Sequence, residues 1–71
     1  MPGITLGQKL KQLRTLNNYR AIEVSAKLNV SVVLISRWEN DKTIPSTTNI
    51  MKLAYLYNVD IQELTKLIKR R

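Results

Sequence analysis

The side chains of this 71-residue chain that could do chemistry are cations, amides and hydroxyls. The chain has no Cys and no His, which removes the usual nucleophile and base pairs and the thiolate and imidazole metal ligands. Its carboxylates are scattered and share no glycine-rich or hydroxyl-bearing site; they belong to Glu23, Glu39, Asp41, Asp60 and Glu63. We therefore expect no catalytic residue, no metal site, no cofactor and no enzyme activity.

Positive charge is the strongest feature of the composition. The chain carries 12 Lys and Arg against 5 Asp and Glu, which gives a formal net charge of +7. A surplus of basic residues favours an acidic partner, either nucleic acid or an anionic membrane surface. No apolar run is long enough to cross a membrane, and the N-terminus has no signal-peptide core, so we expect a cytoplasmic protein without a membrane partner.

The chain is expected to form one small domain over residues 1–71, near the lower size limit for an unaided hydrophobic core. It contains no repeat, low-complexity tract or internal linker. Residues 1–4 should be a loose lead-in, because Pro2 and Gly3 both resist helix formation. Residues 69–71 are expected to be a basic tail, which with Lys66 should be a solvated helix end but could instead add non-specific affinity for DNA.

Residues 19–40 have the pattern of two short amphipathic helices joined by a tight turn. The turn is expected at Asn29, because Asn tolerates a left-handed backbone best after Gly. The first helix should run from about residue 20 to 28, and the second from about 32 to 40 with Ser31 as its cap. Helical spacing turns Ile35 and Trp38 inward. The outward positions of the second helix are then Val32, Val33, Ser36 and Arg37.

Three further helices should position this pair. Thr5 and Gln8 form a capping box for a helix that ends near residues 17–18, and Ser46 or Thr47 can cap a fourth helix ending near residue 57. Asp60 and Glu63 form a second capping box for a fifth helix that continues to Ile68. The expected core contains Leu6, Leu10, Leu13, Leu16, Val24, Ser25, Leu28, Val30, Ile35, Trp38, Ile50, Leu53, Ala54, Tyr57, Ile61, Leu64, Leu67 and Ile68.

The order and spacing of these residues resemble the Cro and phage-repressor type of helix-turn-helix protein, the Xre family. The resemblance rests on residues 6–14 (LGQKLKQLR), 35–40 (ISRWEN), 45–46 (PS), 53–59 (LAYLYNV) and 63–64 (EL), and spans nearly the whole chain. It implies a compact all-α, five-helix, lambda-repressor-like domain whose third helix enters the DNA major groove while the second crosses the backbone. It also implies a small transcriptional regulator, acting as a repressor by occupying double-stranded DNA.

The resemblance implies roles for individual residues. Arg14 and Glu39 stand where family members form an ion pair between the first and third helices, although both could be plain surface charges. Arg37 could donate two hydrogen bonds to a guanine, and Ser36 could reach a base or a phosphate. Val32 and Val33 have no donor or acceptor; they could pack on thymine methyl groups or belong to the core, and Arg37 could contact only phosphate.

Phosphate contacts are expected at the edges of the motif. Arg20 replaces the usual Ser or Thr cap of the second helix, and Ala21 replaces a Gln that often grips the DNA backbone in the family. Asp41 takes the place of a usual Gly and should bring unfavourable negative charge close to DNA. The candidates for phosphate contact are Arg20, Asn40, Lys42, Thr43 and Ser46.

Two interpretations concern partners other than DNA. Ile22, Val32 and Val33 could make an apolar patch on the face that should be most polar, so the fold could instead be a protein-binding module that docks another regulator. The fourth and fifth helices offer more apolar residues than a small core needs, which would suit a homodimer on a palindromic operator, although these residues could also belong to an ordinary core. Those apolar residues are Leu56, Ile61, Leu64, Leu67 and Ile68.

Overall fold

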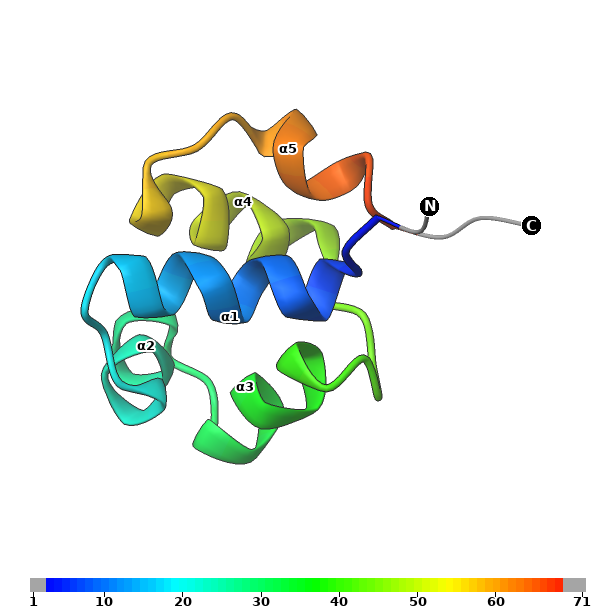
Figure 1. Cartoon of the computed structure of the whole chain (residues 1–71). Helices are drawn as coiled ribbons and strands as arrows, with labels where there is room; N and C mark the ends of the chain where they lie inside the picture. The colour runs from blue at the N-terminus through cyan, green and yellow to red at the C-terminus, as the bar shows by residue number, and fades with distance from the viewer. Residues whose placement is uncertain (1–2, 69–71) are drawn as a thin grey trace.

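The computed structural model describes residues 3–68, and over this range the chain is all-helical. The five helices are α1 (Leu6–Leu16), α2 (Ala21–Leu28), α3 (Val32–Glu39), α4 (Thr47–Tyr57) and α5 (Ile61–Thr65). In Figure 1, α1 crosses the middle of the molecule, with α2 and α3 on one side and α4 and α5 on the other. The predicted five-helix fold is confirmed; the proposed basic tail at residues 69–71 lies outside the described range, as do Met1 and Pro2 of the lead-in.

A single core lies between these helices. Its fully buried centre consists of Leu10, Val24, Ile35, Ile50, Leu53 and Leu64, so every helix contributes at least one side chain. The prediction for Leu16 is wrong: this side chain is exposed and lies beside Gln12 and Thr15 on the outer face of α1. Most of the other predicted core positions are buried or packed against the core.

The fifth helix is shorter than predicted. It ends at Thr65, and the chain continues in tight turns in which the Leu67 N–H donates to the Leu64 carbonyl and the Ile68 N–H to the Thr65 carbonyl. Hydrogen bonds between residues three positions apart, as in a 3₁₀-helix, are common where an α-helix ends. Leu67 and Ile68 still pack against the core, but from this turn rather than from a helix face.

Most of the predicted caps are present. Thr5 and Gln8 form the capping box of α1, the Ser31 hydroxyl accepts from the Leu34 N–H, and the Ser46 hydroxyl accepts from the Asn49 N–H. A side-chain acceptor at this position satisfies one of the first N–H groups of a helix, which have no partner within the helix itself. The backbone start of each of these three helices is therefore fixed by a local residue.

The capping box predicted for α5 is wrong in its second half. The Asp60 carboxylate does cap the helix, by accepting from the Gln62 N–H at 2.9 Å. The Glu63 carboxylate does not return to the Asp60 N–H; it lies 3.6 Å from the Lys9 Nζ on α1. Contact with a charge on another helix has replaced the local hydrogen bond.

The turns between helices use left-handed residues other than Gly. Asn29 has a φ of 59°, as predicted, and Asn18, Asp41 and Asn58 have φ values of 60°, 59° and 57°. Asn and Asp adopt this conformation more readily than other residues with a Cβ. The chain therefore reverses direction after each of its first four helices without a glycine.

The buried phenol of Tyr57 should make the stability of the fold depend on pH. Burial, followed by the nearby negative charge of Glu39, raises the pKa of the Tyr57 phenol above its ordinary value. The unfolded chain therefore loses this proton first, and stability should fall as pH rises above about 10, by up to about 1.4 kcal/mol per pH unit. Urea unfolding at about pH 9 and about pH 11 should show a smaller loss for Tyr57→Phe than for the wild type. Tyr55→Phe, at a side chain that is 90% exposed, is the matched control and should not change the loss; equal losses in wild type and Tyr57→Phe would contradict the prediction.

Candidate nucleic-acid interface

Helix α3 presents one face to the core and another to solvent. Ile35 and Trp38 are buried, whereas Val32, Val33, Ser36 and Arg37 are all exposed. The alternative that the two valines fill the core is therefore not supported. The exposed face combines a hydroxyl and a guanidinium with two apolar side chains.

Arg37 is available for an external partner. Its guanidinium forms no ion pair within residues 3–68, and its backbone carbonyl accepts from the Lys42 N–H at 2.8 Å. A guanidinium carries five N–H donors in a planar fork, which matches two acceptors on the edge of a guanine. The structure thus places the predicted base-reading cation on the open face of α3.

At the C-terminal end of α3, the side chain of the C-cap residue Asn40 hydrogen-bonds to Ser36. The Asn40 side-chain amide donates to the Ser36 carbonyl at 2.9 Å and to the Ser36 hydroxyl at 3.3 Å. Ser36 keeps its O–H for an outside acceptor, because the hydroxyl only accepts in this contact. A phosphate contact from the Asn40 amide would require these hydrogen bonds to be rearranged.

A bidentate ion pair holds α3 to α1. The Arg14 Nε lies 2.7 Å from the Glu39 Oε2 and its second terminal nitrogen lies 3.0 Å from the Glu39 Oε1; the two side chains are 16% and 8% exposed. The hydrogen bond to Glu39 raises the pKa of Arg14 despite its burial. The remaining nitrogen donates to the Tyr19 carbonyl at 3.1 Å, so one guanidinium joins α1, α3 and the loop before α2.

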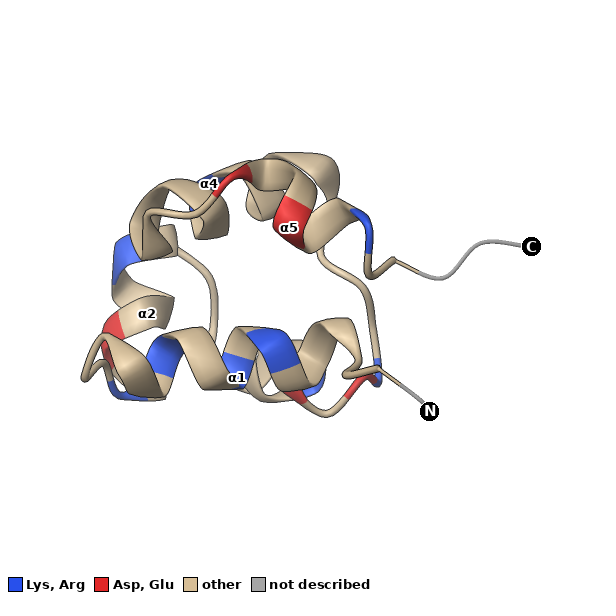
Figure 2. Ribbon diagram, turned by 45° about the horizontal axis from the view of Figure 1, so that its top comes forward, with Lys and Arg blue, Asp and Glu red and all other residues tan. Residues whose placement is uncertain are grey.

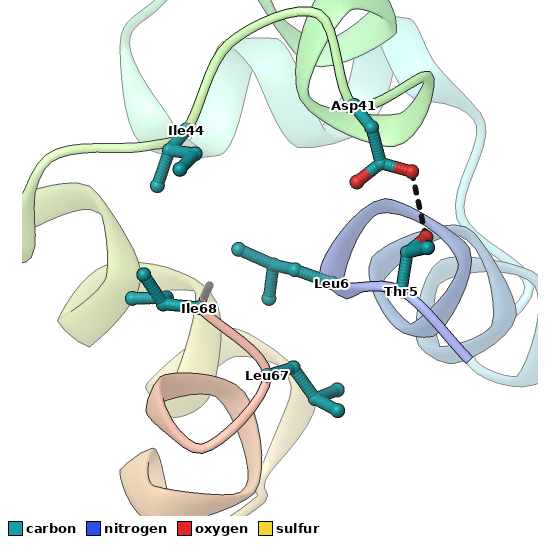
Figure 3. A pocket seen from close by; sticks show the side chains of 6 residues that line it. All are labelled: Thr5, Leu6, Asp41, Ile44, Leu67 and Ile68. Atoms are coloured by element: carbon teal, nitrogen blue, oxygen red, sulfur yellow. Dashed lines mark hydrogen bonds between the residues drawn. The ribbon is translucent and has the colours of Figure 1, made fainter. Parts of the chain in front are cut away.

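A second connection between α1 and the end of α3 was not predicted from the sequence. Asp41 directs its carboxylate at the first turn of α1. One oxygen accepts from the Thr5 hydroxyl at 2.6 Å (Figure 3). The other oxygen accepts from the Gly7 N–H at 2.9 Å. This geometry gives the Asp41 carboxylate a role inside the fold, while the expectation that its negative charge works against DNA binding stays a prediction. Its charge is satisfied by donors at a helix N-terminus, where negative charge is stabilising.

Gly7 allows this close contact. A Cβ at position 7 would lie 2.6 Å from the Glu39 carbonyl oxygen, 2.7 Å from the Trp38 carbonyl oxygen and 2.8 Å from the Asp41 Oδ1. The signal in the sequence was a Gly inside an amphipathic helix, which often marks close approach of another backbone. It could have indicated the contact, but not which segment makes it.

The proposed phosphate contacts differ in their availability. Arg20 and Lys42 are exposed and form no ion pair within residues 3–68. The Ser46 hydroxyl accepts the capping hydrogen bond of α4 but keeps its own proton to donate. The placement of Thr43 argues against its predicted role, because its hydroxyl oxygen is buried and has no hydrogen-bond partner in the described part of the chain.

The start of α2 is capped without a hydroxyl. Arg20 occupies the N-cap position, and its backbone N–H donates to the Glu23 Oε1 at 2.6 Å. A guanidinium has no acceptor, so the Arg20 side chain cannot cap the helix. Glu23 therefore satisfies one backbone donor, and the Arg20 guanidinium stays exposed at this end of α2.

All five carboxylates of the chain have partners inside the fold. Glu39 pairs with Arg14 and Glu63 with Lys9, while the other three accept from backbone N–H groups. In Figure 2 most of the Lys and Arg positions lie in the half of the molecule that contains α1, α2 and α3. Near the end of α3, Arg37 and Lys42 form no ion pair within residues 3–68, whereas Glu39 is paired with Arg14.

The described residues show no sign of two other kinds of site. None of the helices within residues 3–68 is long and apolar enough to cross a membrane. The same range contains no group of three Cys, His, Asp or Glu residues that could hold a metal ion.

The fold and the paired helices α2 and α3 define a helix-turn-helix protein. A helix-turn-helix family model matches residues 10–64, and the chain belongs to this family, in which it is of the Cro and phage-repressor type. The resemblance predicted from the sequence is confirmed.

Two curated relatives are transcriptional regulators. The chain is 36% identical over 61 residues to the HTH-type transcriptional regulator ImmR of Bacillus subtilis, covering 86% of this chain and 48% of ImmR. It is 35% identical over 57 residues to the HTH-type transcriptional activator BcrR of Enterococcus faecalis, covering 80% of this chain and 28% of BcrR. The chain thus spans half or less of the length of these relatives.

Two solved structures have the same fold. The solution structure of the DNA-binding domain of the P22 c2 repressor matches with a TM-score of 0.85 and 25% identity, over 100% of this chain and 96% of that one. The crystal structure of the P22 c2 repressor in complex with a synthetic operator matches with a TM-score of 0.83 and 24% identity, over 87% of this chain and 94% of that one. The lambda-repressor-like architecture is therefore established.

Proposed function

We propose that this chain binds specific sequences of double-stranded DNA and regulates transcription as a repressor, by occupying its operator with α3 in the major groove. The observation that carries the proposal is the placement of Arg37 on the exposed face of a helix that the core and Arg14 hold in position. Binding rather than catalysis is the activity proposed.

The dimensions of α3 suit the groove. An α-helix with its side chains is about 10–12 Å in diameter, and the major groove of B-DNA, about 12 Å wide, admits it. Arg37 would read a guanine, Ser36 a base or a phosphate, and Val32 and Val33 the methyl groups of thymine. Arg20, Lys42 and the Ser46 hydroxyl would contact phosphates around this helix.

The relatives support the same proposal. ImmR is a transcriptional regulator, and the crystallised P22 c2 repressor is in complex with a synthetic operator. BcrR is a transcriptional activator, so occupancy of DNA by this fold is compatible with either direction of regulation. Repression is favoured here because it requires only occupancy, and no separate activating contact has to be assumed.

The proposal is tested by selecting bound sites from random DNA duplexes and by titrating the best site and a scrambled site with salt. The wild type should enrich one motif, and Arg37→Ala should relax the preference at one position by about 1–3 kcal/mol. Lys42→Ala should weaken binding to all sequences and reduce the salt slope by about one unit. Lys66→Ala is the control, because α5 and α3 lie on opposite sides of α1 (Figure 1).

The alternative partner is a protein docked on Ile22, Val32 and Val33. All three side chains are exposed, which is the observation that favours it. If no motif is enriched, and if the binding is weak and only the electrostatic attraction that added salt abolishes, the DNA proposal fails and this alternative is favoured.

A homodimer through α4 and α5 stays a prediction with less support. The apolar residues that suggested it are taken up by the chain's own core: Leu64 is fully buried and Leu56, Ile61, Leu67 and Ile68 pack against the core. Sedimentation of the free protein and of its complex with the selected site would show whether two copies assemble.

A further inference from the structure

A groove lies between α2 and α4, away from the exposed face of α3. It has a volume of about 700 Å³. Leu28 and Leu56 supply apolar surface, with Met51 and Tyr55 of α4 beside them. Lys27 from the last turn of α2 and Lys52 from α4 also line it. None of these residues belongs to the proposed DNA interface.

The side chains of the groove have the character of an interface core. Tyr55 is 90% exposed and Met51 is 55% exposed, although both lie on a helix whose other face fills the core. Aromatic residues and Met are enriched where proteins bind one another, because they offer large contact areas and adapt to irregular surfaces. Leu28, which is buried, gives the groove a fixed apolar floor.

The charge at the groove is of one sign. Lys27 and Lys52 line it, and no Asp or Glu does. The Lys27 ammonium lies 5.6 Å from the centre of the Tyr19 ring, a cation–π contact that limits where this charge can move. The nearest acidic residue along α2 is Glu23, and its carboxylate accepts from the Arg20 N–H at the opposite end of the helix.

We propose that this groove docks an acidic amphipathic segment of a partner protein. Apolar side chains of that segment would cover Met51 and Tyr55, and its Asp or Glu residues would pair with Lys27 and Lys52. The site is separate from the exposed face of α3, so the domain would bind DNA and this segment at the same time. The proposal goes beyond DNA binding and does not depend on it.

A second copy of the chain fits the groove less well. A symmetric dimer places the same patch on both partners, so Lys27 and Lys52 of one copy would face the same cations on the other, with no carboxylate in the patch to pair with them. An acidic partner removes this repulsion.

The test is a selection of random displayed peptides on the immobilised wild-type protein, counter-selected on a Tyr55→Ala variant. Enriched peptides should carry aromatic or aliphatic residues next to several Asp or Glu. Synthetic copies should bind Tyr55→Ala about tenfold more weakly, the loss typical of an exposed aromatic anchor at an interface. Circular dichroism should show that this variant keeps its helices, because its side chain contributes little to the core.

Charge reversal separates the groove from general electrostatic attraction. Lys27→Glu/Lys52→Glu should abolish binding of the selected peptides, whereas the charge-matched Lys11→Glu/Lys66→Glu variant should retain it. Binding of DNA by Tyr55→Ala should be unchanged, so failure of this proposal is distinguishable from failure of the DNA proposal. Peptides without acidic residues, or equal losses in the two charge-reversed variants, would overturn the proposal. Self-association abolished by Tyr55→Ala would also overturn it, in favour of a second copy.

Discussion

Gly7→Ala should destabilise the domain by about 2–3 kcal/mol, a large part of the 5–15 kcal/mol that holds a typical domain folded. In an exposed helix the same change would add up to about 1 kcal/mol of stability, because Ala is the better helix former. Here the sign reverses. The new Cβ would lie 2.6 and 2.7 Å from two backbone carbonyl oxygens at the end of α3, and backbone atoms cannot move aside by changing rotamer.

Urea unfolding measures this effect, and Gly3→Ala is the matched control. Gly3 has nothing within 4 Å of the position that its Cβ would occupy, so its replacement should be close to neutral. Because the clash pushes α1 away from the end of α3, Gly7→Ala should also lose DNA affinity at temperatures where it is still folded. A Gly7→Ala variant as stable as Gly3→Ala would show that the two helices do not approach as closely as described.

Breaking the ion pair between Arg14 and Glu39 is the second large effect. Arg14→Met leaves the Glu39 carboxylate, only 8% exposed, without its cation, and the loss of one member of a buried pair costs about 3–5 kcal/mol. The double variant Arg14→Met/Glu39→Met removes both charges and should be clearly more stable than Arg14→Met alone, since no unpaired charge is left buried. Equal stabilities of the single and double variants in urea unfolding would contradict this interpretation.

The pair formed by Lys9 and Glu63 is the internal control for this experiment. Its side chains are 23% and 45% exposed and the two charged atoms lie 3.6 Å apart. Pairs exposed to this degree contribute about 0–1 kcal/mol. The same double-mutant cycle on Lys9 and Glu63 should therefore give a much smaller interaction energy than the cycle on Arg14 and Glu39.

The parts of the fold that could be predicted from the sequence are those that depend on near neighbours. Helical spacing correctly placed Ile35 and Trp38 inward and Arg37 outward on α3. The capping role of Ser31 and the left-handed turn at Asn29 also depend on residues only a few positions apart. These features are set by local backbone chemistry, which the sequence displays directly.

The features that were missed depend on partners far along the chain. Asp41 accepts from Gly7, which is 34 residues away, and spacing within one helix cannot reveal such a contact. Glu63 has the right spacing for a capping box, yet lies near Lys9 of another helix. Thr43 looks like an exposed loop hydroxyl in the sequence, but the packed loop buries its oxygen. In each case tertiary packing overrides an expectation that rests on neighbouring residues alone.

The way in which the fold uses its five carboxylates affects how the protein should behave in concentrated salt. The acidic contacts within the fold are short-range, and the closer of the two ion pairs, between Arg14 and Glu39, is shielded from solvent. Attraction between exposed cations and DNA phosphates is instead weakened strongly by added salt. High salt should therefore release the protein from DNA while leaving it folded, so that dissociation and denaturation can be followed as separate events.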